Sequence, residues 1–179
     1  GNASDVSGNG HHGNVNGATL GVDRHGAVGQ AYFLDGIDDY VEVQDAPSLN
    51  FGSGDFTVGG WVQKLSATVN WKGVFINKWN TGAVPGTNEW SLGVSNTATS
   101  GIPTFGLEVG NTYGSVSGPS ALDLNKWVQL AGVRDGQNLR LYLDGQMIGE
   151  ETGAAGAVNN TGRNLFFGRF KDVGPIYSH

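Results

Sequence analysis

The chain has 179 residues, no cysteine and a formal net charge of -6 at pH 7. The lack of cysteine excludes a disulfide framework and thiol chemistry. The ten lysines and arginines are scattered singly, which argues against a nucleic acid partner because a phosphate backbone requires a clustered basic surface. No run resembles a membrane span or a signal peptide, so we expect no membrane insertion. A cytosolic protein and an excised piece of an exported protein both remain open.

Glycine dominates the composition, with 31 residues in total against about 7% in an average protein. Most stretches between glycines are too short for long helices, so the pattern predicts an all-β chain with many tight turns. Residues 1–30 are expected to be mostly loop. In chain order, strands are predicted at 31–34, 40–43, 56–63, 73–79, 89–94, 104–110, 126–134, 139–143, 147–151 and 164–170. This number of short strands indicates a two-sheet antiparallel sandwich or jelly roll.

One hairpin is predicted in detail from its residues. Alternation along 139–143 directs Leu139, Leu141 and Leu143 toward the core. The dipeptide Asp144-Gly145 follows, and these residue types tolerate the positive φ angles of a tight two-residue turn. A second strand is therefore expected to return from this turn.

The segment "DVSGNGHHG", residues 5–13, crowds potential ligands into a glycine-rich loop. Its glycine spacing matches a dinucleotide-binding turn, but neither a strand before it nor a helix after it is predicted. Adjacent histidines point apart on an extended chain, which disfavours zinc. Calcium fits better, since Asp5 and Asn9 offer the oxygen ligands it prefers. The alternative, in which Asp5 only caps backbone N–H groups of the turn, remains open.

Several segments together resemble the LamG-like jelly-roll domains of the concanavalin A-like lectin/glucanase superfamily. They appear in family order and spacing as "DVSGNGHHGNVNG", "GQAYFLDGIDDYVEV", "DFTVGGWV", "KWVQLAGVRDGQNLRLYLDGQMIGE" and "LFFGRF". The resemblance covers nearly the whole chain. It implies one jelly-roll domain over residues 1–179, of the kind found as a module in multidomain exported proteins. Such modules commonly bind calcium, glycans or protein partners and are often non-catalytic.

The same resemblance implies specific calcium ligands. The family's early loop falls on Asp5 to Gly10, and its second motif falls on Phe33, Gly36 and Asp39-Tyr40-Val41, with one extra residue after Phe33. Asp5 and the carbonyl of Gly36 match two family ligand positions. The family's first strand and its last strand, which carries a third ligand, have no counterpart here, so unpaired edges and an open core are expected.

A second resemblance, to the calcium-loop regions of pentraxins, involves "NEWSLGV" (88–94) and "FGRFKD" (167–172). In pentraxins the ligand is held through the metal. The resemblance implies that Asn88 and Asp172 provide the matching oxygens.

Acidic residues do not form a catalytic pattern. Retaining glucanases of this fold place carboxylates on alternate residues of one strand, about 5 Å apart. No two acids stand at positions i and i+2 in this chain, and Asp38/Asp39 and Glu150/Glu151 are adjacent pairs that point to opposite faces if extended. We therefore expect a chain that is not an enzyme.

The five tryptophans separate into two groups. Trp61 and Trp127 lie inside alternating strands and are expected to pack in the core. Trp71, Trp79 and Trp90 flank a polar loop, and an indole face beside amide groups suits a sugar ring. The predicted ligand-binding residues are Trp79, Asn80, Asn88, Trp90 and Asp172. Asn77 is a further polar partner, and Tyr113 and the loop 111–120 are weaker candidates. A hydrophobic plug beneath the loop is the open alternative.

The sequence thus favours a calcium-dependent module that binds glycans or cell-surface partners, located outside the cell or on its surface. Its alternative is a structural or protein-interaction spacer without glycan affinity. A polysaccharide-degrading enzyme ranks third, because it would need acids brought together from distant strands.

Overall fold

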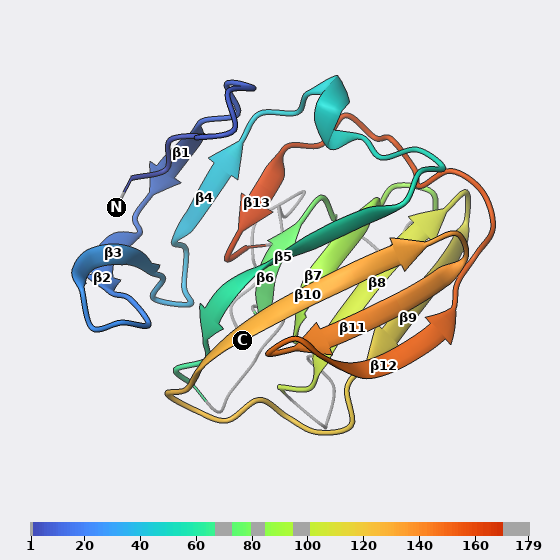
Figure 1. The fold of residues 1–179 in the computed structure, drawn as a ribbon. Helices are drawn as coiled ribbons and strands as arrows, with labels where there is room; N and C mark the ends of the chain where they lie inside the picture. The colour runs from blue at the N-terminus through green and yellow to red at the C-terminus, as the bar shows by residue number, and fades with distance from the viewer. Residues whose placement is uncertain (1, 67–72, 80–84, 95–100, 170–179) are drawn as a thin grey trace.

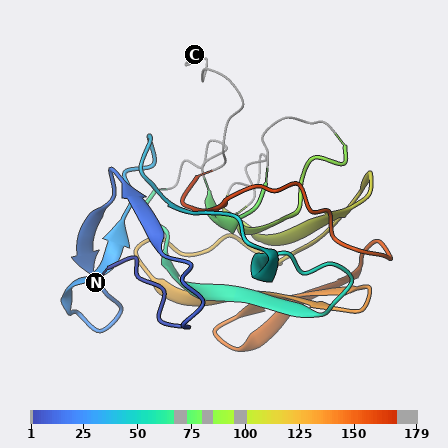
Figure 2. The same ribbon diagram turned by 90° about the horizontal axis from the view of Figure 1, so that it is seen from above.

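The computed structural model describes residues 2–66, 73–79, 85–94 and 101–169. Two antiparallel sheets pack face to face, and a two-stranded ribbon lies at one end (Figures 1 and 2). The predicted two-sheet antiparallel sandwich is confirmed. Within the described ranges, no helix offers the length and apolar character needed to cross a bilayer.

Among the described residues, seven strands form the larger sheet and four form the smaller one. The larger sheet has the order β1 (Gly13–Asn16), β4 (Tyr40–Val43), β13 (Leu165–Phe167), β6 (Val74–Asn77), β7 (Trp90–Val94), β8 (Pro103–Val109) and β9 (Thr112–Ser117). The smaller sheet has the order β12 (Gln146–Thr152), β11 (Asn138–Leu143), β10 (Trp127–Asp135) and β5 (Phe56–Gln63). The ribbon pairs β2 (Thr19–Val22) with β3 (Val28–Phe33), and a 3-10 turn, η1 (Pro47–Leu49), follows β4.

The hydrophobic core lies between the two sheets. It is built from the inward residues of both layers, among them Leu92, Phe105, Leu107, Leu130 and Leu141, each fully buried. Aromatic rings fill one end, where Phe51 stacks on Phe56 with centroids 4.1 Å apart. Burial of apolar area contributes about 25 cal/mol per Å², so this layer contact is the main stabilising term of the fold.

The predicted hairpin forms as expected. Leu139 and Leu141 are buried, Leu143 is partly buried, and the turn residues Asp144 and Gly145 have φ angles of 49° and 78°. Strands β11 and β12 pair on either side of this turn.

Residues 1–30 are mostly loop, as expected, but they also contain β1, β2 and the start of β3, and β1 pairs with β4 at the edge of the larger sheet. The expectation of a loop at 111–120 is wrong, because β9 lies within this segment. Its residues are mostly small and polar, and only Val116 is buried in the core. The hydrophobic pattern of β9 does not predict a strand, and pairing with β8 stabilises it.

Candidate functional site

Small and polar residues line the outer face of the larger sheet. Side chains alternate along a strand, so residues between the buried core positions of β7, β8 and β9 project away from the smaller sheet. On this face lie Ser91, Gly93, Thr104, Gly106, Ser115 and Ser117. Ser91 is directly opposite Gly106, which is in turn opposite Ser115. The three strands therefore carry small and polar residues on this face.

Two aromatic side chains meet on this surface. The rings of Trp79 and Tyr113 pack edge to face, with centroids 5.3 Å apart and an interplanar angle of 72°. Tyr113 is 52% exposed, and Trp79 is partly buried. Tyr113 lies opposite Glu108 in the strand register and extends over Gly106, where a side chain would collide with it. We call Trp79 and Tyr113 the aromatic pair.

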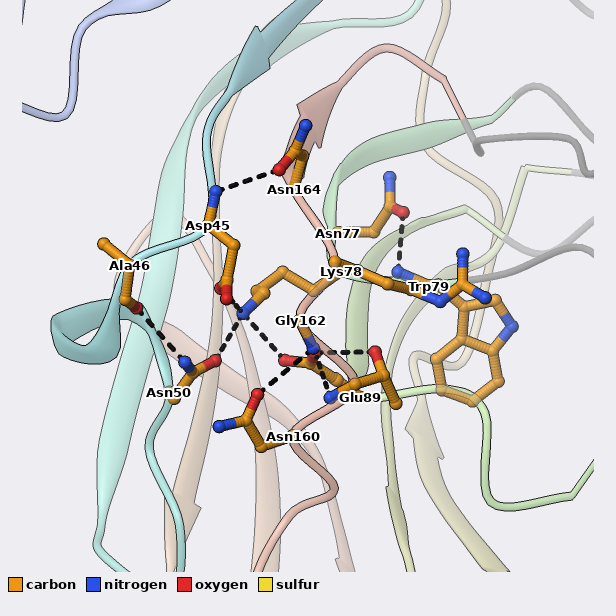
Figure 3. A network of polar contacts seen from close by, with 12 residues as sticks. Asp45, Ala46, Asn50, Asn77, Lys78, Trp79, Glu89, Asn160, Gly162 and Asn164 are labelled. Carbon is orange, nitrogen blue, oxygen red and sulfur yellow. Dashed lines mark hydrogen bonds and ion pairs between the residues drawn. The ribbon is translucent and has the colours of Figure 1, made fainter.

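The backbone that carries Trp79 is fixed by polar contacts. The Trp79 amide donates to Asn77 Oδ1 at 3.0 Å, and Asn77 Nδ2 donates to the Arg169 carbonyl at 2.8 Å. Asn77 is fully buried, whereas the Trp79 indole lies to one side of the polar network (Figure 3). The segment is thus anchored from behind while its aromatic ring remains at the surface.

A buried lysine lies next to Trp79 in sequence. Lys78 is fully buried, and its Nζ donates to Asp45 Oδ1 at 2.7 Å and to Asn50 Oδ1 at 2.5 Å (Figure 3). It also forms an ion pair with Glu89 Oε2 at 2.9 Å. The ammonium group therefore has three oxygen partners, which is the condition under which a charge can be held away from water.

Two buried carboxylates hold the loop that follows β12. Glu89 Oε1 accepts hydrogen bonds from the Thr161 amide at 2.9 Å and hydroxyl at 2.8 Å. Glu108 Oε2 accepts from the Asn88 amide at 2.9 Å and from Asn159 Nδ2 at 3.4 Å. Both carboxylates are thus engaged in positioning backbone beside the aromatic pair.

Of the predicted ligand-binding residues, some lie at the surface, some are buried and some lie outside the described residues. Trp79 lies at the surface as expected, and Tyr113 joins it. The prediction for Trp90 is wrong, because its side chain is only 2% exposed and packs in the core among Phe51 and Phe56. Asn88 is 5% exposed, so its side chain is not on an open surface. Asn80, Asp172 and Trp71 lie outside the described residues.

Asp5 caps the turn of the opening loop. Asp5 Oδ1 accepts from the Ser7 amide at 2.7 Å and Oδ2 from the His11 amide at 2.9 Å. These hydrogen bonds, those with Ser7 foremost, stabilise the carboxylate and lower the pKa of Asp5. Both Asp5 and Gly36 line one large cavity, whereas Asn9 lies on an exposed part of the loop and does not.

Gly36 belongs to an acidic turn between β3 and β4. Carboxylate oxygens of Asp35, Asp38 and Asp39 lie within 4.8 Å of one another. The turn is shaped by its own hydrogen bonds, since Asp35 Oδ1 accepts from the Ile37 amide and Asp39 Oδ2 from the Asp35 amide. Closely spaced carboxylates are a donor set that suits calcium. Sequence reasoning considered Asp38 and Asp39 as an adjacent acidic pair, and Asp39 as part of the family's second motif, but it did not group them with Asp35.

The expectation that Trp61 packs in the core is also wrong. Trp61 is 42% exposed on the outer face of β5, opposite to the face of Phe56 and Val58. The guanidinium of Arg24, from the loop between β2 and β3, lies 4.6 Å from its ring centroid. The alternation of β5 predicts this exposure, because Trp61 and Thr57 lie on the same face of the strand. Trp127 is partly buried.

The fold and the sequence assign the family. A family model described as the concanavalin A-like lectin/glucanases superfamily matches residues 35–175. The chain therefore belongs to this superfamily, in its laminin G-like group, as the sequence motifs indicated. No curated protein matches the chain.

Three solved structures have a similar fold. Domain 4 of AbnA, a GH43 extracellular arabinanase from Geobacillus stearothermophilus in complex with arabinotriose, is 15% identical with a TM-score of 0.66, over 94% of this chain and 79% of that one. The binding domain of Paraclostridial Mosquitocidal Protein 1 is 17% identical with a TM-score of 0.65, over 92% and 41%. A botulinum neurotoxin type C structure, from work on its interaction with two ganglioside molecules, is 17% identical with a TM-score of 0.61, over 98% and 42%. This chain thus spans about two fifths of both toxin structures.

Proposed function

We propose that this chain is a non-catalytic carbohydrate-binding module of an exported protein, with its binding surface at the aromatic pair. The observation that carries the proposal is the edge-to-face packing of Trp79 and Tyr113 above a floor of serine, threonine and glycine. The C–H edges of a sugar ring can stack on an exposed aromatic ring, and its hydroxyls can bond to small polar side chains. Such a surface suits a neutral glycan.

The similar structures support this proposal. One was solved with arabinotriose bound, and another belongs to a toxin whose cell entry depends on gangliosides. The net charge of -6 also suits a neutral glycan better than an acidic polymer. An extracellular or cell-surface location, in a multidomain chain, is part of the proposal.

A non-catalytic role is supported by the carboxylates nearest the aromatic pair. Glu89 is 1% exposed and forms an ion pair with Lys78. Glu108 is 4% exposed and accepts hydrogen bonds from the Asn88 backbone amide and from Asn159 Nδ2. A general acid or base must reach the substrate. Glu89 and Glu108 are buried and their oxygens bind other protein groups, so they cannot do this.

Calcium is proposed as the cofactor, at the acidic turn of Asp35, Asp38 and Asp39 with the Gly36 carbonyl as a further oxygen ligand. The metal would neutralise the three neighbouring carboxylates and stiffen the turn. Asp5, which matches the other ligand position of the family motif, is a second candidate ligand.

A glycan array tests the proposal directly. The protein should bind a subset of neutral oligosaccharides, and Trp79→Ala should abolish the signal while the thermal unfolding midpoint stays close to that of the original protein. Trp61→Ala is the matched control, since Trp61 is also partly exposed but lies on the opposite sheet. A parallel array in excess chelator reports whether calcium is needed. No binding to any glycan, with or without calcium, would favour the spacer function instead.

A further inference from the structure

Lys78 brings a primary amine against an amide carbonyl inside the protein. The side chain of Lys78 is fully buried, and its Nζ lies 2.5 Å from Oδ1 of Asn50 (Figure 3). A carbonyl bond measures about 1.23 Å, so Nζ lies at most about 3.7 Å from the carbonyl carbon, Cγ. Reacting atoms in a near-attack arrangement are about 3–3.5 Å apart. The amine is therefore held close to a carbon that it can attack.

Two carboxylates contact the same nitrogen. Asp45 Oδ1 lies 2.7 Å and Glu89 Oε2 2.9 Å from Nζ, and the side chain of Glu89 is 1% exposed whereas that of Asp45 is 24% exposed. A lysine amine becomes a nucleophile when an adjacent base takes its extra proton. Transfer of a proton from Nζ to Glu89 leaves a neutral amine beside a neutral acid, so it adds no charge to the buried site.

The site lies beside the aromatic part of the core. Phe51 follows Asn50 in the chain and Trp90 follows Glu89, and these two rings pack with centroids 5.8 Å apart. Both Trp90 and Lys78 are almost completely buried. Water would compete with the amine for the carbonyl carbon, and burial keeps water away from it.

Asn50 is the better electrophile of the two acceptors that contact Nζ. Its side-chain amide is neutral, whereas the ionised carboxylate of Asp45 resists attack by a nucleophile. Asn50 Nδ2 donates to the Ala46 carbonyl at 3.2 Å, which identifies Oδ1 as the atom that faces Lys78. The χ2 torsion of asparagine is broad, so the carbonyl can turn its face toward Nζ.

We propose that Lys78 and Asn50 react to form an isopeptide bond between Nζ and Cγ, with Glu89 as general base and acid. Glu89 Oε2 takes one proton from the ammonium group, and the freed electron pair of Nζ attacks Cγ. The Cγ–Nδ2 bond then breaks with its electron pair on Nδ2, which receives the proton from Glu89. Glu89 takes a second proton from Nζ, and the released ammonia carries that proton away as ammonium. Atoms and charge balance without an oxidant or a reductant.

The bond joins two segments that are distant in the chain. Asn50 follows η1 and Lys78 follows β6, so the cross-link closes a loop over residues 50–78. A cross-link restricts the unfolded chain and thereby stabilises the folded one, as a disulfide does. Because the chain contains no cysteine, it has no disulfide to supply this stabilisation. The proposal does not depend on glycan binding.

The intact mass of residues 1–179 under denaturing conditions tests the proposal. The protein should be lighter than its calculated mass by one ammonia molecule. Trypsin should fail to cut after Lys78, and one product should contain residues 25–64 joined to residues 73–126. A mass equal to the calculated value after prolonged incubation overturns the proposal. Loss of one water molecule also overturns it, because that loss would place the bond on Asp45.

Two substitutions identify the reacting side chains. Lys78→Met should keep its full calculated mass. A loss of ammonia that persists in Lys78→Met would come from a succinimide at an asparagine and would overturn the proposal. Asn50→Asp should lose one water molecule instead of ammonia, and should reach the same final mass as the original protein, because both reactions leave the same amide.

A pair of glutamate variants tests the base. Glu89→Gln should slow the loss of ammonia at least tenfold, because it removes the carboxylate that accepts the proton from Nζ. Glu108→Gln is the matched control and should react like the original protein. Glu108 is also buried, but its Oε2 accepts hydrogen bonds from Asn88 and Asn159 instead of Lys78. Equal reaction rates in the two variants would overturn the assignment of Glu89.

Discussion

Gly106 lies directly beneath the ring of Tyr113. A side-chain carbon at Gly106 would meet the Tyr113 hydroxyl oxygen at 2.5 Å and ring carbon Cε2 at 2.8 Å. Because Gly106 of β8 has no side chain, Tyr113 of β9 can lie across the sheet and reach Trp79. The aromatic pair depends on this glycine as much as on its two rings.

Gly106→Val should displace the Tyr113 ring and weaken glycan binding about tenfold, the equivalent of one lost aromatic contact of ~1.4 kcal/mol. Isothermal titration with the best glycan from the array measures the change. Thr57→Val on the outer face of the other sheet is the control and should bind normally. An unchanged affinity in Gly106→Val would remove Tyr113 from the binding surface.

Trp90→Ala should destabilise the fold rather than act on binding. The indole is 2% exposed and packs on Phe51 and Phe56, so its removal leaves a large cavity at a cost of about 3–5 kcal/mol. Urea denaturation at constant m-value measures the loss. Trp61→Ala, at a 42% exposed position, should cost much less. Equal losses for the two tryptophans would contradict the assignment of Trp90 to the core.

Lys78→Met should leave the carboxylates of Glu89 and Asp45 without their buried cation, at a cost of about 3–5 kcal/mol in unfolding free energy. Adding Glu89→Gln removes one of the orphaned charges, so the double variant should be more stable than the sum of the single losses. Lys126→Met is the control, because its ion pair with Asp123 is long and exposed. Strict additivity would show that Lys78 and Glu89 are not energetically coupled.

Calcium should raise the unfolding midpoint if the acidic turn binds it. A ligand that binds only the folded state at 100 times its Kd adds about 2.7 kcal/mol. Asp38→Asn should reduce this gain, since Asp38 is one of the three clustered carboxylates. Asp123→Asn, 77% exposed at its side chain and far from the cluster in sequence, should keep it. Identical melting curves in calcium and in chelator would refute the calcium proposal.

Lowering the pH should reveal how much Asp5 contributes to the unfolding free energy. Hydrogen bonds from Ser7 and His11 lower its pKa below the usual 3.8, so its stabilising effect is fully present above pH 3.8. The effect is lost as the pH falls through the lowered folded-state pKa. Between pH 5 and 2 the unfolding free energy of Asp5→Asn should therefore fall less steeply than that of the original protein. Parallel curves would show that the capped turn contributes nothing to pH dependence.

Strands with strong alternation were predictable from sequence. The expected bounds of β4 and β5 agree with the structure, and the hairpin turn at Asp144-Gly145 forms as its residue types require. Strand β9 was not predictable, because its small polar residues carry no hydrophobic period and only pairing with β8 stabilises it. The polar surroundings of Trp79 led to its selection as a ligand-binding candidate, which stays a prediction, but the same reasoning misassigned Trp90.

The chain's own residues thus determined the fold class and the family, because hydrophobic alternation, glycine turns and family motifs are local properties of the sequence. Only the tertiary structure decided which aromatic side chains lie at the surface and which are buried in the core. Trp90 and Trp79 flank the same loop, yet one is directed into the core and the other toward Tyr113. The face on which a side chain emerges depends on strand register and on the buried bonds of Lys78 and Glu89, which join residues far apart in the chain.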